Sequence, residues 1–83
     1  MARDNAAQRA RIHEAILDYI RRYPLAADTA EGILACWLPH TEFEDAPDHI
    51  AAILEDMVAS RSLQARQLPD GKILYARGDA PNN

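Results

Sequence analysis

Residues 47–77, PDHIAAILEDMVASRSLQARQLPDGKILYAR, decide the fold of this chain, because a helical pattern runs directly into a hairpin pattern. Apolar side chains recur at helical spacing through the first half of this stretch. They are Ile50, Ile53, Leu54, Met57 and Val58. Pro47 lies near the start, where a helix tolerates a missing N–H. The pattern predicts a helix from about Ala46 to Ser60.

The second half of the stretch carries two short segments, from Ser62 to Leu68 and from Lys72 to Arg77. Between them lies Pro69-Asp70-Gly71, in which Gly71 is free to take a positive φ. In the second segment, Ile73 and Tyr75 share one face and Leu74 and Ala76 share the other. We therefore expect a two-stranded β-hairpin that follows the helix directly.

Two further helices precede this stretch. The first is predicted from about Ala6 to Arg22, where one face carries Ile12, Ile16, Tyr19, Ile20 and Tyr23 and Pro24 follows. The second is predicted from about Thr29 to Leu38, with an apolar face of Ile33, Leu34, Trp37 and Leu38, and Pro39 ends it. Residues 25–27 form a short connector between these two helices.

The length of 83 residues fits one domain, which we place at residues 6–77. Residues 1–5 and 78–83 are polar ends that we expect to be disordered. Cys36 is the only cysteine, so no disulfide can form within the chain. No apolar run approaches the roughly 20 residues of a membrane span, and the N-terminus lacks a signal-peptide core. We therefore expect a cytoplasmic protein with no membrane partner.

Charge is strongly segregated along the chain. No Lys or Arg occurs between Tyr23 and Ser60, whereas that stretch holds eight of the 13 acidic residues. All nine basic residues lie outside it, although the net charge of the whole chain is −4. Segregation of this kind indicates a polarised surface, and the sign of a surface selects its partners.

Three helices followed by a hairpin resemble the winged-helix family, a variant of the helix-turn-helix. The segments that carry the resemblance are ILDYIRRYP, TAEGILACWL, IAAILEDMVASRSL and LPDGKILYAR. The resemblance implies an α+β fold in which three helices precede a two-stranded hairpin, the wing. It also implies a DNA-binding transcription regulator, with the third helix in the major groove and the wing on the DNA backbone.

The wing is the expected DNA contact in this chain. Its basic residues are Arg61, Arg66, Lys72 and Arg77, whose side chains could neutralise phosphates. The same charges could instead only keep an edge hairpin soluble. The exposed face of the third helix offers carboxylates rather than the Arg, Lys, Asn or Gln that read bases, so it would contribute less than the wing.

The alternative function is protein binding, in which the acidic middle of the chain (residues 28–56) docks on a basic partner, with the winged helix as an interaction module or inhibitor. The carboxylates that would form this surface are Glu42, Glu44, Asp45, Asp48, Glu55 and Asp56. The resemblance also implies that a homodimer through the first helix is common.

No pattern in the sequence indicates an enzyme. The three glycines are scattered, so no phosphate-binding loop is present. Cys36 and His40 are four residues apart, but Pro39 lies between them and no fourth metal ligand is evident. We therefore expect no metal and no cofactor.

Overall fold

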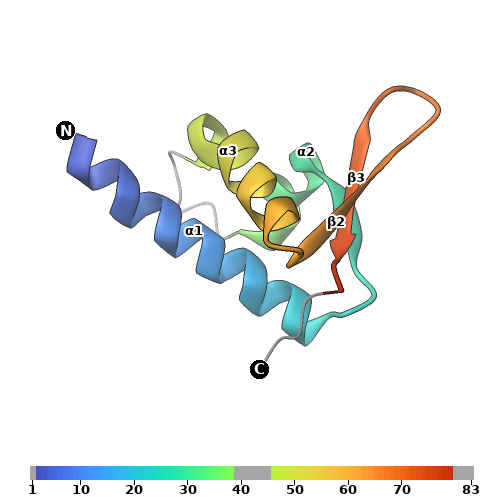
Figure 1. The fold of residues 1–83 in the computed structure, drawn as a ribbon, viewed down its shortest axis with the longest axis horizontal. Helices are drawn as coiled ribbons and strands as arrows, with labels where there is room; N and C mark the ends of the chain where they lie inside the picture. Colours follow the sequence, from blue (N-terminus) through green and yellow to red (C-terminus); the bar gives the residue numbers. More distant parts are fainter. Residues whose placement is uncertain (1, 39–45, 80–83) are drawn as a thin grey trace.

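The computed structural model describes residues 2–38 and 46–79, which form helices packed against an antiparallel sheet (Figure 1). The helices are α1 (Ala2–Arg22), α2 (Ala30–Gly32), which continues directly into the π-helix η1 (Ile33–Trp37), and α3 (Ala46–Ala59). The strands are β1 (Ala27–Thr29), β2 (Leu63–Gln67) and β3 (Ile73–Arg77). The α+β class with three helical segments is therefore confirmed.

Helix α1 is longer than the sequence predicts, since it begins at Ala2 rather than at Ala6. The added residues include the strong helix formers Ala2 and Arg3, and Asp4 has the charge that favours the first turn of a helix. Arg21 and Arg22 occupy its last turn, where positive charge favours a helix.

The second helical segment begins at Ala30, one residue after the predicted start, and Thr29 is its N-cap. The side-chain oxygen of Thr29 accepts a hydrogen bond from the Gly32 N–H at 3.2 Å. After Gly32 the α-helix changes into the π-helix η1, which ends at Trp37. The ring of Trp37 stacks on the ring of Tyr19 in α1, with ring centroids 4.6 Å apart and ring planes inclined by 14°. This aromatic contact joins the end of η1 to the C-terminal half of α1.

One hydrophobic core joins the helices to the sheet. Its fully buried side chains come from α1, η1, α3 and β2 and are Ile12, Ile16, Ile20, Ile33, Leu54, Met57 and Leu63. The predicted apolar faces of α1, the second helix and α3 supply most of them. The prediction that Tyr23 belongs to the apolar face of the first helix was wrong. Tyr23 follows the last residue of α1 and is 50% exposed. Leu17 is buried although it was not predicted.

The sheet has three strands rather than the predicted two. Its order is β1-β3-β2, and both contacts are antiparallel. The third strand, β1, lies in the segment that we expected to be a connector and the start of the second helix, and it pairs Asp28 with Tyr75. Three residues are too few for an alternating apolar pattern to be visible in the sequence. β1 is therefore extended because it pairs with the distant strand β3, and its local sequence gives no strand signal.

The joint between α3 and β2 is closed by main-chain hydrogen bonds. The Arg61 N–H donates to the Val58 carbonyl at 3.0 Å, and the Ser62 N–H donates to the Met57 carbonyl at 2.9 Å. Arg61 has φ 68, so it occupies the left-handed position that usually holds glycine at the end of a helix. The Gly78 N–H donates to the Ser62 carbonyl at 2.9 Å. Gly78, which we assigned to the tail, is thus bonded to this joint.

Replacing Gly78 with alanine should destabilise the fold. A Cβ on Gly78 would overlap the backbone carbonyl of Arg61 and approach the backbone nitrogen of Leu63 at 2.9 Å. Because backbone atoms must move to make room, we expect Gly78→Ala to cost about 1–3 kcal/mol in chemical denaturation.

Gly71→Asn is the matched control. Gly71 has φ 92 with open space around it, and asparagine tolerates the left-handed region. Equal losses in the two variants would show that crowding at Gly78 is not the cause.

Candidate functional site

The hairpin register separates two of the four predicted wing cations. Arg66 lies opposite Leu74, and Arg77 lies opposite Leu63. Because side chains alternate along a strand, Arg77 shares the face of the buried Leu63, whereas Arg66 stands on the outer face. Both side chains are exposed, and neither has an ion pair with any side chain of residues 6–38 or 46–79. They cannot contact one flat surface together.

Arg61, the third predicted cation, is held by a carboxylate near the C-terminus. Its Nε donates to Asp79 Oδ1 at 3.2 Å and its Nη2 donates to Asp79 Oδ2 at 3.1 Å. These two hydrogen bonds, together with the attraction between the charges, lower the pKa of Asp79 and raise that of Arg61. The guanidinium of Arg61 is therefore already partnered within the chain. Asp79, assigned to the tail with Gly78, takes part in the fold.

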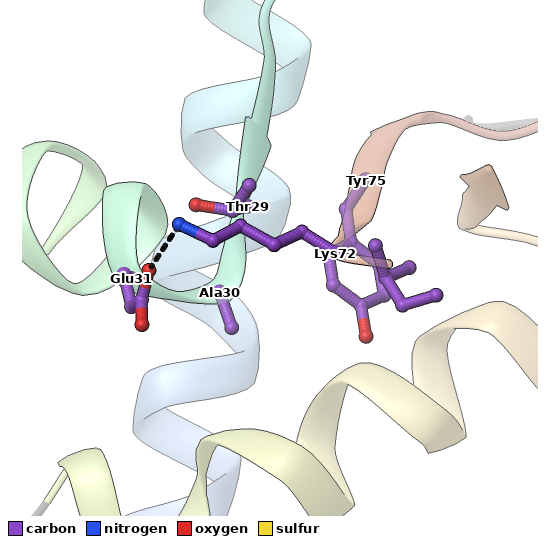
Figure 2. A pocket seen from close by; sticks show the side chains of 6 residues that line it. Thr29, Ala30, Glu31, Lys72 and Tyr75 are labelled. Carbon is purple, nitrogen blue, oxygen red and sulfur yellow. Dashed lines mark ion pairs between the residues drawn. The ribbon is translucent and has the colours of Figure 1, made fainter. Parts of the chain in front are cut away.

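Lys72, the fourth predicted cation, turns from the hairpin towards the second helix. Figure 2 shows its side chain extended across a shallow pocket, and its Nζ lies 3.7 Å from Glu31 Oε1. The pocket has a volume of about 210 Å³ and is lined by Thr29, Ala30, Glu31, Lys72, Ile73 and Tyr75. Both partners of the ion pair are largely exposed, so its contribution to stability is small.

The structure therefore does not gather the predicted DNA-binding residues into one basic patch. Two cations are paired, and two point from opposite faces of the hairpin. The partners Asp79 and Glu31 were missed by sequence reasoning. Each lies far from its cation along the chain, so spacing gave no signal for either.

Helix α3 presents the opposite arrangement. Asp48, Glu55 and Asp56 are exposed, and no ion pair joins them to any side chain of residues 6–38 or 46–79. The small side chains of Ala51, Ala52 and Ala59 lie among them on the solvent side of the helix. We call these six residues the acidic face of α3. The other predicted docking residues, Glu42, Glu44 and Asp45, lie outside the residues that the structure describes.

A second depression runs between the N-terminal half of α1 and α3. It has a volume of about 360 Å³ and is lined by Ala6, Arg9, Ala10, His13, Ile53 and Asp56. Arg9 Nε donates to His49 Nδ1 at 3.4 Å, which links the two helices. The apolar residues of α1 itself, Ile12, Ile16 and Ile20, are fully buried inside the chain, so the predicted dimer surface on this helix would have to use other residues.

The described residues show no sign of a metal centre. Among the side chains of residues 6–38 and 46–79, no three His, Cys, Asp or Glu cluster as metal ligands would. Cys36 is exposed, and His40 lies in the segment that the structure does not describe. Among the described helices, none combines the length and the apolar character of a membrane span.

The Arg61–Asp79 pair should give the stability of the joint a dependence on acid pH. The lowered pKa of Asp79 means that the pair stabilises the fold above the ordinary carboxyl pKa of about 4, and that this contribution is lost as pH falls through the lower folded value. In a carbon-detected NMR titration, Asp79 should titrate below the ordinary range, and Arg61→Gln should return it to that range. Arg66→Gln removes a cation that makes no contact with Asp79, so it should leave the titration unchanged.

No protein-family model, no curated protein and no solved structure matches this chain.

Proposed function

We propose that this chain is a winged-helix protein that acts as a protein-interaction module, and that the acidic face of α3 binds a basic segment of its partner. The order of three helical segments and a C-terminal hairpin supports the winged-helix resemblance. The proposal assigns no catalytic reaction and no cofactor to the protein.

The acidic face of α3 carries this proposal. Three exposed carboxylates on one helix have no ion pair with the side chains of residues 6–38 and 46–79, while alanines between them leave room for long Lys or Arg side chains to approach. In a DNA groove the same carboxylates would face phosphates and oppose binding. Towards a basic peptide they give complementary charge, which favours specificity and fast association.

The test uses a Lys- and Arg-rich helical peptide, titrated into the isotopically labelled protein and followed by NMR. We expect chemical-shift changes centred on α3, with an affinity that falls as salt increases, because exposed charges are screened. Glu55→Lys combined with Asp56→Lys should weaken binding about tenfold or more, since repulsion replaces attraction.

Glu14→Lys combined with Asp18→Lys is the matched control. It makes the same change in net charge at two exposed carboxylates of α1. If this pair weakens binding as much as the α3 pair, binding follows net charge only and the proposed surface is wrong.

DNA binding through the hairpin is the second candidate. The observation in its favour is that the hairpin extends beyond the body of the molecule (Figure 1). Arg66 is exposed on the outer face of this hairpin. A duplex would have to compete with Glu31 for Lys72 and with Asp79 for Arg61.

Fluorescence anisotropy with mixed duplex DNA tests this candidate. If the hairpin neutralises even a few phosphates, affinity should fall about tenfold or more between about 50 and 200 mM salt. Arg66→Glu combined with Lys72→Glu should abolish binding, whereas Arg21→Glu combined with Arg22→Glu on α1 should not. Duplex binding that survives the hairpin substitutions would exclude wing-led recognition.

A further inference from the structure

The depression between α1 and α3 lies where the packing of these two helices ends. Leu17 of α1 is 8% exposed and belongs to the core, whereas Ala6 and Ala10, on the same side of the helix, are exposed. At these two positions a methyl group stands where a large apolar side chain would continue the packing. The depression, with a volume of about 360 Å³, is therefore the unfilled end of the contact between α1 and α3.

The base of this depression is apolar. Ile53 lines it although only 3% of this residue is exposed, so Ile53 lies at the bottom. The methyl groups of Ala6 and Ala10 line the same depression. A large apolar side chain that entered it would be removed from water against these residues, which is favourable in proportion to the apolar area buried. Small hollows of this kind hold the anchor residues of protein interfaces.

The two rims of the depression differ in charge. Asp56 on the α3 rim also belongs to the acidic face of α3, so the depression and that face are continuous. Arg9 and His13 form the α1 rim, and Arg9 is tied to His49 of α3 by the hydrogen bond of 3.4 Å. A basic segment is therefore attracted on the α3 side of the depression and repelled by Arg9 on the α1 side.

Resting on the proposed function, we propose that the basic segment bound by the acidic face of α3 is a helix with one large apolar side chain, which enters this depression. The lysines and arginines of the segment lie over α3, on one side of the apolar side chain, because Arg9 disfavours them on the other side. A helix presents such an anchor and its charged flank from one face. The partner is then recognised by an anchor beside a basic flank, and not by positive charge alone.

The anchor and the charges contribute to binding in different ways. Complementary charge speeds association and is screened by salt. A buried apolar anchor contributes chiefly by slowing dissociation, and salt screens it little. The gain in affinity from the anchor should therefore persist at a salt concentration that weakens the charge contribution.

The first test compares three helical peptides of equal net charge by NMR titration into the labelled full chain. One carries a tryptophan with lysines on one side, the second replaces that tryptophan with alanine, and the third places the same lysines on both sides of the tryptophan. We expect the first to bind about tenfold or more tighter than the second, at about 50 and at about 200 mM salt, and tighter than the third. The additional chemical-shift changes should centre on Ala6, Ala10 and His13.

The second test fills the depression with Ala10→Leu. Ala10 is exposed and leucine is a strong helix former, so the fold should be kept, as circular dichroism would show. The variant should bind the tryptophan peptide no better than the alanine peptide, and its affinity for the alanine peptide should be unchanged. Ala7→Leu is the matched control, because Ala7 is an exposed residue of α1 that does not line the depression.

Equal affinity for the tryptophan and alanine peptides would overturn the anchor, and so would a tryptophan gain that survives Ala10→Leu. The alanine peptide reports on the proposed function separately. If this peptide binds and tryptophan adds nothing, the acidic face of α3 remains the binding surface and only the anchor is wrong. If Glu55→Lys combined with Asp56→Lys leaves its binding unchanged, the proposed function itself is wrong. Absence of binding by all three peptides would overturn both.

Discussion

The packing of α1 against α3 and η1 is the interaction on which the rest of the structure depends. Ile12, Ile16 and Ile20 of α1 are fully buried, as are Leu54 and Met57 of α3. Each such side chain contributes roughly 1.5–3 kcal/mol before conformational entropy is subtracted. The sheet contributes the buried Leu63 of β2 to the same core, and the partly buried Tyr75 of β3 packs against it. These two contacts fix the hairpin strands to the helices.

Local pattern was sufficient to predict the helices and the hairpin, because each depends on apolar residues a few positions apart. Of the predicted apolar stripe of α3, all but Val58 are buried, and Val58 is partly buried against the core; the helix ends at Ala59, one residue before the predicted end. The third strand was missed because three residues carry no period and pair with β3 from far along the chain. Tyr23 was misplaced because the face it continues ends at Arg22, before the tyrosine.

Charge was harder to interpret than hydrophobicity. Four cations near one hairpin suggested a patch, but a patch depends on strand register and on partners that come from elsewhere in the sequence. Asp79 neutralises Arg61, Glu31 neutralises Lys72, and the alternation of side chains separates Arg66 from Arg77. The carboxylates of α3 were easier to place, because the positions of charges on a helix follow from its period.

The pairing of β1 with β3 also sets an order for folding. This pairing brings Asp28 beside Tyr75, with α2, η1, α3 and β2 between them along the chain. Contacts of such high sequence separation have a large loop-closure entropy and form slowly unless intervening structure has already shortened the loop. During synthesis, β1 leaves the ribosome well before its partner exists. The sheet can therefore be completed only after α3 and the hairpin have been made, and until then the β1 segment has no strand to join.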